Sequence, residues 1–337
     1  MTKLRVGHIG WLSRDEAADY TTVAWCDINA DKVRAQAAKY PGITPYTDYR
    51  EMLREAKLDA VVISTPNFVH AEQAIAFLEA GVHVFLEKPM GVTQAECDAI
   101  LRAARRSGKT CAIDFEMRIS PFAAKMKRLI ASRECGDLRH LEFIHHRGCW
   151  LDEGNGKWRT KPEQSGGLYF MEPIHEVDIF RHFAGEITAV QSIAAPTVLP
   201  QYQFQDNVCS HFFFESGVLG TILTSHTHSA YTKDATLWAK LGHDMNMIFT
   251  FTEGSVAVDF IGAKLLYNRF EVYPAGSTAR RVVHDRIEDY SAGGWHGFFH
   301  DIAAMRIAFL QRLAAGQPPV QDLADAWRTH RVCLAAE

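Results

Sequence analysis

Short apolar segments alternate with amphipathic segments along the first third of the chain. The apolar segments are β-favouring and short enough to be strands buried in a parallel sheet. They cover residues 4–9, 22–26, 60–64, 82–86 and 110–114. The segments between them predict helices, at residues 30–40, 49–56, 70–80 and 93–107. Because strand and helix alternate at short intervals, we predict an α/β fold with a doubly wound parallel sheet.

Beyond residue 117 the pattern becomes mostly β. A helix is predicted at 122–131, a strand at 138–146, and a polar loop at 148–167. The helical pattern of 167–183 contains Pro173, which predicts a kink or a helix start at that point. Closely spaced strand-like segments then predict an antiparallel sheet. These segments are 187–194, 208–215, 218–225, 247–252 and 255–260, and helices at 297–315 and 323–336 close the chain.

The change of pattern predicts two domains. The first covers residues 1–117 and holds the parallel sheet, and the second covers 118–337 and is an α+β domain with a mostly antiparallel sheet. The two closing helices could pack on the first domain although they follow the second in sequence. A chain of 337 residues with 47% hydrophobic content is long enough to bury two such cores.

The segment Glu87-Lys88-Pro89 directly follows the apolar segment 82–86. Proline lacks the N–H of the ladder and disfavours a helical conformation of the preceding residue, so the strand ends here. The carboxyl ends of parallel strands form the edge where open α/β sheets bind ligands. We therefore place Lys88 at the centre of a predicted active site, although an exposed lysine before a turn proline would show the same three residues.

Asp27 ends the second predicted strand. An acid at this position can accept hydrogen bonds from an adenosine ribose and repel a 2′-phosphate, which favours NAD over NADP. A helix-capping Asp before the segment 30–40 is an equally good interpretation. The preceding loop is unusual for a dinucleotide site, because Gly10 supplies only the first glycine of Gly-x-Gly-x-x-Gly and Leu12 stands at the second. We expect Leu12 to crowd a pyrophosphate, and the first crossover helix to be only one or two turns long.

Composition excludes several classes of protein. A net charge of −4 leaves no basic surface for nucleic acid. No apolar run approaches the ~20 residues of a membrane helix, and the chain leads straight into a strand, so no signal peptide is expected. The seven cysteines lack a Cys-x-x-Cys pair and predict reduced thiols in a cytoplasmic protein.

Several of these segments together resemble the glucose–fructose oxidoreductase / inositol dehydrogenase / rhizopine-catabolism (Gfo/Idh/MocA) family. The matching residues are Ser64-Thr65-Pro66-Asn67 with His70, Glu87-Lys88-Pro89, Met117-Arg118-Ile119-Ser120-Pro121, and Ser165-Gly166-Gly167 followed by His175 and Asp178. The resemblance implies an N-terminal Rossmann domain and a C-terminal domain built on a large open sheet, whose face forms homodimers or homotetramers. It also implies hydride transfer between NAD(P) and a sugar, cyclitol or related polyol, with the family's Lys at Lys88 and its His at His175.

The expected catalytic residues are Lys88, His175 and Asp178. The Lys88 ammonium can stabilise an alkoxide, an imidazole can accept a hydroxyl proton near pH 7, and Asp178, three residues after His175 on a helix, could orient the ring. The expected cofactor-binding residues are Gly10, Trp11, Leu12, Asp27, Ser64, Thr65, Pro66, Asn67, His70, Glu87 and Lys88. The expected substrate-binding residues are Arg118, Trp158, Arg159, Glu172 and His175.

Met171 stands where the family often has a catalytic Asp, and the neighbouring Glu172 is turned about 100° away on a helix. Trp150, Trp158 and Arg159 suit a sugar ring but could equally be buried structural residues. The pairs His145-His146 and His226 with His228 lack a Cys or acidic partner at zinc spacing, so we expect no metal site.

Three functions remain open. The first is an NAD-dependent sugar or polyol dehydrogenase, and the second is a glycosidase or lyase that oxidises a sugar transiently and restores NAD. The third is a non-catalytic ligand-binding relative that keeps the fold. Leu12, the short first crossover and Met171 favour the third, whereas the retained Lys88, His175 and Asp178 favour the first two.

Overall fold

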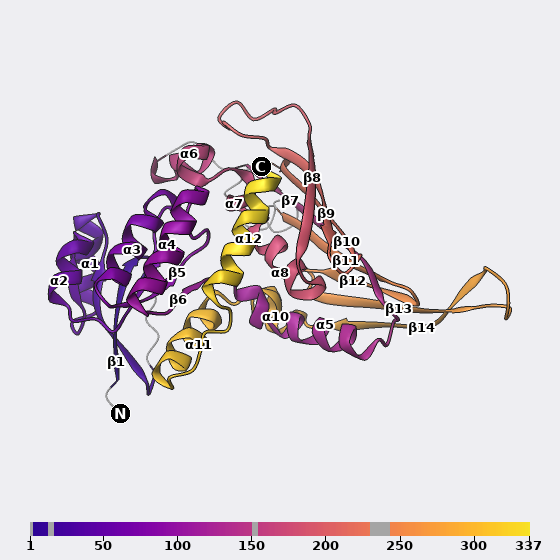
Figure 1. Cartoon of the computed structure of the whole chain (residues 1–337), viewed down its shortest axis with the longest axis horizontal. Helices are drawn as coiled ribbons and strands as arrows, with labels where there is room; N and C mark the ends of the chain where they lie inside the picture. The colour runs from indigo at the N-terminus through magenta and orange to yellow at the C-terminus, as the bar shows by residue number, and fades with distance from the viewer. Residues whose placement is uncertain (1–2, 13–16, 150–153, 230–242) are drawn as a thin grey trace. The chain divides into compact units, whose positions relative to one another are not determined.

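The structure is a computed structural model that describes residues 3–12, 17–149, 154–229 and 243–337 (Figure 1). Its contacts divide the chain into two compact units. The first unit comprises Met1–Phe115, Glu163–Gly166 and Ile302–Leu334, and the second comprises Glu116–Pro162, Gly167–Asp301 and Ala335–Glu337. The two closing helices are thus counted largely with the first unit.

The first unit contains a six-stranded parallel sheet in the order β3-β2-β1-β4-β5-β6. The strands are β1 (Leu4–Gly10), β2 (Tyr20–Cys26), β3 (Thr44–Tyr46), β4 (Ala60–Ser64), β5 (His83–Leu86) and β6 (Cys111–Ile113). The predicted doubly wound parallel sheet is confirmed. The prediction missed β3, which is three residues long and contains Pro45.

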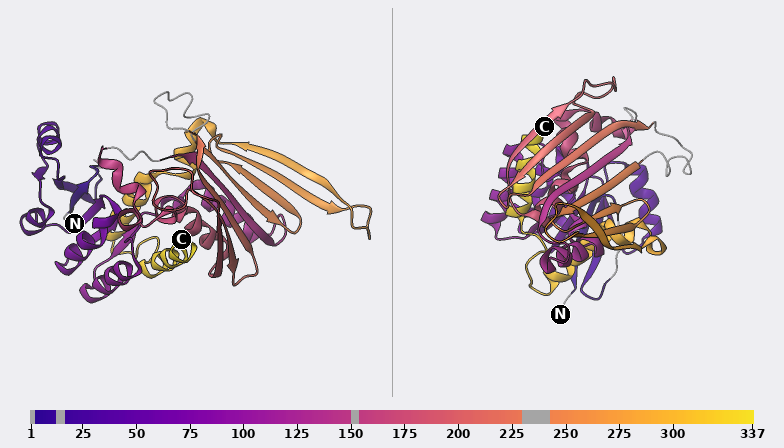
Figure 2. Two further views of the ribbon diagram at one scale, coloured as in Figure 1. Left: turned by 90° about the horizontal axis from the view of Figure 1, so that it is seen from above. Right: turned by 90° about the vertical axis from the view of Figure 1, so that its right-hand side faces the viewer.

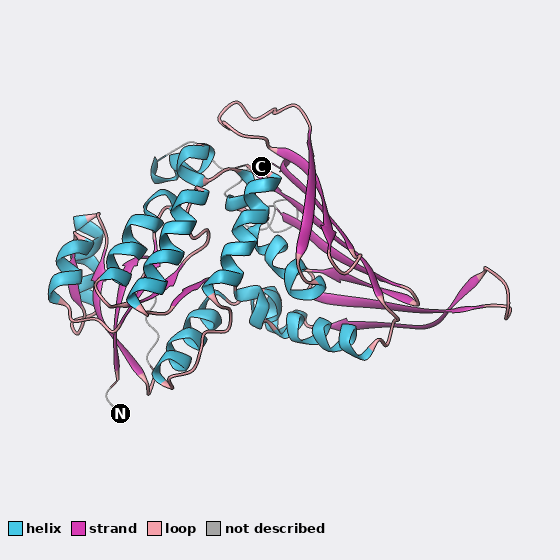
Figure 3. Cartoon of the chain, in the orientation of Figure 1, coloured by secondary structure: helices cyan, strands magenta, loops and turns pink. Residues whose placement is uncertain are grey.

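Helices flank this sheet where the amphipathic segments predicted them (Figure 3). They are α1 (Ala30–Lys39), α2 (Tyr49–Glu55), α3 (His70–Glu79) and α4 (Gln94–Ser107), followed late in the chain by α11 (Ile302–Ala314) and α12 (Leu323–Ala336). The predicted cap Asn29 accepts from the N–H groups of Asp31 and Lys32. A short helix was expected between β1 and β2. The described residues of that segment form no helix, and residues 13–16 within it lie outside the description.

The second unit is built on an eight-stranded sheet in the order β14-β13-β12-β11-β7-β10-β9-β8, whose strands lie side by side in Figure 2. The strands are β7 (Leu138–Gly148), β8 (Ile187–Ala194), β9 (Asn207–Phe214), β10 (Leu219–Ser229), β11 (His243–Phe251), β12 (Gly254–Asp259), β13 (Lys264–Val272) and β14 (Arg280–Asp289). Among the described strands, β7 and β10 pair in parallel and the other neighbours are antiparallel, as predicted. The prediction missed β13 and β14.

Helices of the second unit include α5 (Pro121–Ser132), α7 (Leu168–Met171), α8 (Ile174–Ala184) and α10 (Gly294–Phe299). The helical segment 167–183 breaks at Glu172 and Pro173, as the proline predicted. The single helix predicted at 297–315 is wrong, because α10 ends at Phe299 and α11 begins at Ile302. Phe122 is fully buried among Phe183, Phe249 and Phe260, with ring centroids 5.5–6.1 Å from it, and this aromatic cluster forms the core between α5 and the sheet.

The seven cysteines all lie among the described residues and form no disulfide. Within the described part of the chain, no helix is both long and apolar enough to cross a membrane. The cytoplasmic location stays a prediction.

Candidate active site

The predicted cofactor-binding residues lie at one edge of the six-stranded sheet. Gly10 ends β1, Asp27 follows β2, Ser64 ends β4 and Glu87 follows β5. These four strands are neighbours in the order β2-β1-β4-β5, so their carboxyl ends lie along one stretch of the edge. The chain direction of the crossovers reverses between β1 and β4, which is where doubly wound sheets bind nucleotides.

Gly10 makes the turn at the end of β1. Its φ is +84°, and a Cβ built on it would collide with the carbonyl oxygen of Ser64. The N–H of Trp11 donates to that same oxygen over 3.3 Å, and the Trp11 side chain is 72% exposed. Leu12 is partly exposed. A glycine is therefore required at position 10 by the close approach of β1 and β4, independently of any ligand.

The carboxylate of Asp27 makes a hydrogen bond to the backbone and an ion pair with a lysine. Its Oδ1 accepts from the N–H of Asn29 over 3.0 Å, and its Oδ2 forms an ion pair with Lys32. The Asp27 side chain is 12% exposed, and the Lys32 ammonium lies 5.6 Å from the centre of the Trp25 ring. The carboxylate thus helps to set the start of α1 while part of it remains open to solvent, so the ribose contact stays a prediction.

Side chains of the 64–67 turn form hydrogen bonds within the first unit. The Thr65 hydroxyl donates to Gln73 over 2.8 Å, and the Asn67 amide donates to the carbonyl oxygen of Ser165 over 2.7 Å. Nδ1 of the buried His70 lies 2.6 Å from the carbonyl oxygen of Pro89, and its Nε2 lies 2.8 Å from that of Thr65. Burial lowers the pKa of His70, so the ring is neutral and donates its single proton to one of these carbonyls at a time. His70 therefore bridges the loops that follow β4 and β5.

A residue that we did not predict anchors the loop of Lys88. The N–H of Met90 donates to Nε2 of His330 over 2.7 Å, and Nδ1 of His330 donates to the carbonyl oxygen of Ala326 over 2.8 Å. The two bonds fix the Nδ1-protonated tautomer of a fully buried ring on α12. On the Lys88 side, the backbone N–H of Lys88 donates to the Glu87 carboxylate over 3.2 Å. A histidine on the apolar face of a distant helix carries no sequence signal for this role.

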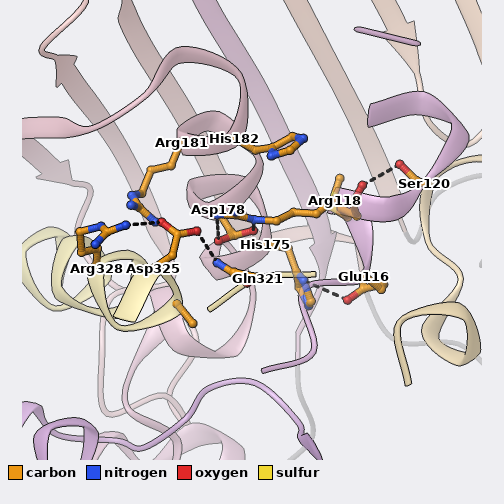
Figure 4. A network of polar contacts seen from close by, with 12 residues as sticks. Glu116, Arg118, Ser120, His175, Asp178, Arg181, His182, Gln321, Asp325 and Arg328 are labelled. Carbon is orange, nitrogen blue, oxygen red and sulfur yellow. Dashed lines mark hydrogen bonds and ion pairs between the residues drawn. The ribbon is translucent and has the colours of Figure 1, made fainter. Parts of the chain in front are cut away.

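In the second unit, His175 lies in the first turn of α8 and faces the carboxylate of Glu116 (Figure 4). Nδ1 of His175 is 3.4 Å from Oε2 of Glu116, and Nδ1 of His300 is 2.9 Å from Oε1. Burial alone would raise the pKa of Glu116, but the adjacent imidazoles outweigh it and hold the pKa below its usual value. The result is an ionised carboxylate between two histidine rings, and neither Glu116 nor His300 was among the predicted site residues.

Asp178, which we expected to orient His175, forms a bidentate ion pair with Arg118 (Figure 4), and its predicted role toward His175 stays a prediction. Nε of Arg118 donates to Oδ2 over 2.5 Å, and Nη2 donates to Oδ1 over 2.8 Å. Both side chains are largely buried. This pair holds the guanidinium of Arg118 in one orientation, and Nδ1 of His175 lies 3.4 Å from the Glu116 carboxylate.

Glu172 lies in a second buried polar cluster. Its Oε1 forms an ion pair with Arg147 on β7, and its Oε2 is 3.8 Å from Nε2 of His145. Nδ1 of His145 is 3.0 Å from Oε1 of Glu176. Burial would raise the pKa of Glu176, but His145, together with His175 and a backbone hydrogen bond, holds the pKa below its usual value. Met171, at the end of α7, is buried and supplies no titratable group.

The remaining candidates are the Trp and Arg residues of the polar loop and the paired histidines. The Arg159 guanidinium stacks 4.5 Å from the centre of the Trp158 ring, which places both in one cation–π pair. Trp150 and the side chain of His228 lie outside the described residues. Nδ1 of the buried His226 bonds the Tyr202 hydroxyl over 2.9 Å. In the described ranges no three His, Cys, Asp or Glu side chains are grouped so as to hold a metal ion.

Comparison with known proteins places this geometry in a family. The model described as "Oxidoreductase family, NAD-binding Rossmann fold" matches residues 8–115, and the "GFO/IDH/MocA C-terminal domain" matches residues 123–257. The scyllo-inositol 2-dehydrogenase (NAD(+)) of Bacillus subtilis (strain 168) is 29% identical over 89% of this chain and 81% of its own length. The D-glucoside 3-dehydrogenase of Escherichia coli (strain K12) is 30% identical over 52% of this chain, which spans half the length of that relative.

A solved structure titled levoglucosan dehydrogenase in complex with NADH covers 99% of this chain and 96% of its own, with a TM-score of 0.78. At 19% identity this likeness concerns the fold. The two family models match successive parts of the chain, one on each of its two sheets. The chain belongs to the Gfo/Idh/MocA family of oxidoreductases, whose first domain is an NAD-binding Rossmann fold.

Proposed function

We propose that this protein is an NAD-dependent dehydrogenase that oxidises a secondary hydroxyl of a sugar, cyclitol or related polyol. The observation that carries the proposal is the edge of the six-stranded sheet, where Gly10, Asp27, Ser64 and Glu87-Lys88 lie at the carboxyl ends of neighbouring strands. The relatives named as inositol and glucoside dehydrogenases support the class of substrate.

The residues at this edge fit a dinucleotide. The turn at Gly10 brings the backbone of β1 close to that of β4, and the partly exposed carboxylate of Asp27 is available to a ribose. A 2′-phosphate would meet the same carboxylate, so we propose NAD rather than NADP, with Trp11, Leu12 and the 64–67 turn beside it. The bound nicotinamide supplies the hydride acceptor.

We assign the proton chemistry to Lys88 and His175. The Lys88 ammonium donates a hydrogen bond to the reacting oxygen and stabilises its alkoxide character, and the loop that carries it is fixed by His70 and His330. His175 accepts the hydroxyl proton on Nε2, because its Nδ1 faces the ionised Glu116. Arg118, held by Asp178, is proposed to bind another oxygen of the substrate, with Trp158, Arg159 and Glu172 as further substrate contacts.

The test is a panel of cyclitols, sugars and sugar acids incubated with the protein and NAD or NADP, with NADH absorbance as the readout. The proposal expects net NADH from at least one polyol. A sugar that is cleaved without net NADH would favour the transient oxidation of a glycosidase or lyase. Tight NAD binding without turnover of any member would favour a non-catalytic relative, for which Met171 is the supporting observation.

We also propose that the eight-stranded sheet forms a homodimer or homotetramer. Its face opposite the buried core exposes apolar side chains on adjacent strands, among them Ile193, Phe213, Leu219 and Leu223. Exposed contiguous apolar surface of this kind is typical of an interface between subunits.

A further inference from the structure

The family position that often carries a catalytic Asp is occupied here by the buried Met171. A thioether is only a weak acceptor, so Met171 can neither hold an imidazole tautomer nor stabilise an imidazolium. To act as a base, His175 needs a partner that fixes its tautomer and stabilises its imidazolium. If the resting proton were on the nitrogen that faces the substrate, that nitrogen would have no lone pair for the hydroxyl proton. Another acid must therefore act on His175 if it is the base.

Three carboxylates lie near His175 in the second unit, and their partners differ. Asp178 is bound by both guanidinium nitrogens of Arg118. Glu176 lies 3.0 Å from His145. Glu116 forms an ion-pair contact with the His175 ring, with 3.4 Å between its Oε2 and Nδ1 of His175.

His300 fixes the other side of Glu116. Its Nδ1 is 2.9 Å from Oε1, and the centroids of the two imidazole rings are 5.8 Å apart. The Glu116 side chain is 2% exposed, and an ionised carboxylate so deeply buried needs charged or donating partners on both oxygens. One imidazole ring lies at ion-pair distance from each oxygen, and the lowered pKa of Glu116 agrees with this arrangement.

We propose that Glu116 is the positioning residue of His175 and takes over the task of the acid that Met171 lacks, with His300 holding Glu116 in place. This inference rests on the proposed function for its catalytic part. Glu116 keeps the resting proton of His175 on Nδ1 and leaves the Nε2 lone pair to the substrate. When the hydroxyl O–H bond breaks, its proton forms the new N–H bond at Nε2. The O–H electron pair forms the C=O bond as the hydrogen on the adjacent carbon leaves with its bonding pair, a hydride that a bound nicotinamide would accept, and Glu116 balances the imidazolium charge.

The direct test needs no substrate. We propose ¹⁵N NMR of histidine-labelled full-length protein, which distinguishes the two imidazole tautomers, with His175→Gln used to assign the His175 signals. The wild type is expected to hold His175 in the Nδ1-protonated form. Glu116→Gln is expected to mix the tautomers of His175, whereas the matched control Glu176→Gln, an adjacent buried acid, is expected to disturb His145 instead. An unchanged His175 tautomer in Glu116→Gln overturns the proposal.

The kinetic test uses whichever polyol reduces NAD. Glu116→Gln is expected to lower kcat by at least ~10-fold and by no more than the ~10²–10⁴ lost with a general base itself, while KM changes by less than about threefold. Glu116→Asp restores the charge and is expected to recover part of the rate, and it replaces Glu116→Gln if that variant does not fold. A roughly tenfold rise in KM with an unchanged kcat would overturn the positioning role of Glu116. If no polyol reacts, the proposed function fails while the tautomer result still decides the role of Glu116.

Discussion

Replacing His175 by alanine removes the group that we propose accepts the hydroxyl proton. Loss of a general base typically costs ~10²–10⁴ in rate, so kcat of His175→Ala should fall by that factor. The kcat of Lys88→Met should fall by a comparable factor, because no other ammonium is assigned to the reacting oxygen. Single-turnover NAD reduction measures the chemical step, and NAD affinity by calorimetry serves as the control. Near-native turnover of His175→Ala would mean that the proton leaves by another route.

The choice of cofactor should depend on Asp27. Its carboxylate already bonds the N–H of Asn29 and pairs with Lys32. Asp27→Ala therefore removes these two contacts and frees the Lys32 ammonium to meet a 2′-phosphate. We expect NAD affinity to fall by ~1–3 kcal/mol, the range of a hydrogen bond to a charged group, and NADP affinity to rise. Calorimetry with both cofactors measures the two changes. Adding Lys32→Ala to the Asp27 variant should weaken NADP binding again if the Lys32 ammonium faces the 2′-phosphate.

At the scale of single elements, α12 should contribute to the stability of the Lys88 loop through one ring. His330→Ala leaves the buried N–H of Met90 without its acceptor, which typically costs ~1–3 kcal/mol. The free energy of unfolding from a denaturant titration should fall by about that amount. Arg331→Ala, at the exposed neighbouring position of the same helix, should change it by less. Equal effects of the two variants would show that the hydrogen bond to Met90 contributes little.

Elements were predictable where burial set the pattern. β4 and β5 are apolar at nearly every position because both of their faces are covered, and Pro173 broke its helix as expected. β14 escaped prediction because its residues are mostly exposed and charged, so no apolar alternation marks it. The position of Lys88 at the end of β5 was predictable because the apolar segment stops at Leu86, just before Glu87-Lys88-Pro89. The contact of Glu116 with His300 joins residues far apart in sequence, and no local pattern predicts it.

At the scale of whole-chain stability, buried neutral histidines should make the fold sensitive to acid. Burial, with a smaller effect of Arg306, lowers the pKa of His8 from 6.5 to about 3. The unfolded chain binds a proton near pH 6.5 and the folded chain does not, so stability is present above that pH and is lost as the pH falls. The loss is about 1.4 kcal/mol per pH unit below 6.5 for this one group.

His8→Gln should therefore flatten the dependence of stability on pH between 6.5 and 5. Thermal melts across this range measure the effect, with His284→Gln at an exposed position as the control. The control should keep the wild-type slope. An identical slope in the His8 variant would mean that other groups cause the acid sensitivity, among them the buried His70 and His226, whose pKa values burial also lowers.

The largest-scale prediction concerns the exposed face of the eight-stranded sheet. Leu223 on β10 is paired with Ile144 on β7 and Cys209 on β9, and Cys209 is in turn paired with Ile193 on β8. This row crosses four strands on the face away from the aromatic core. A stable interface buries about 800 Å² on each subunit, and a sheet face of this width can supply it.

A lysine at the centre of that row would place an ammonium in the interface without a partner, and its desolvation is strongly unfavourable. Leu223→Lys should therefore convert the oligomer to monomer in light scattering, while its circular dichroism remains native because the side chain is already 39% exposed. Val320→Lys is the matched control, since Val320 is 40% exposed and lies in the first unit. Its mass should remain that of the wild type. If the wild type is itself monomeric at micromolar concentration, the sheet face is not an interface between copies of this chain. If Leu223→Lys keeps the wild-type oligomer, the subunits associate through another surface.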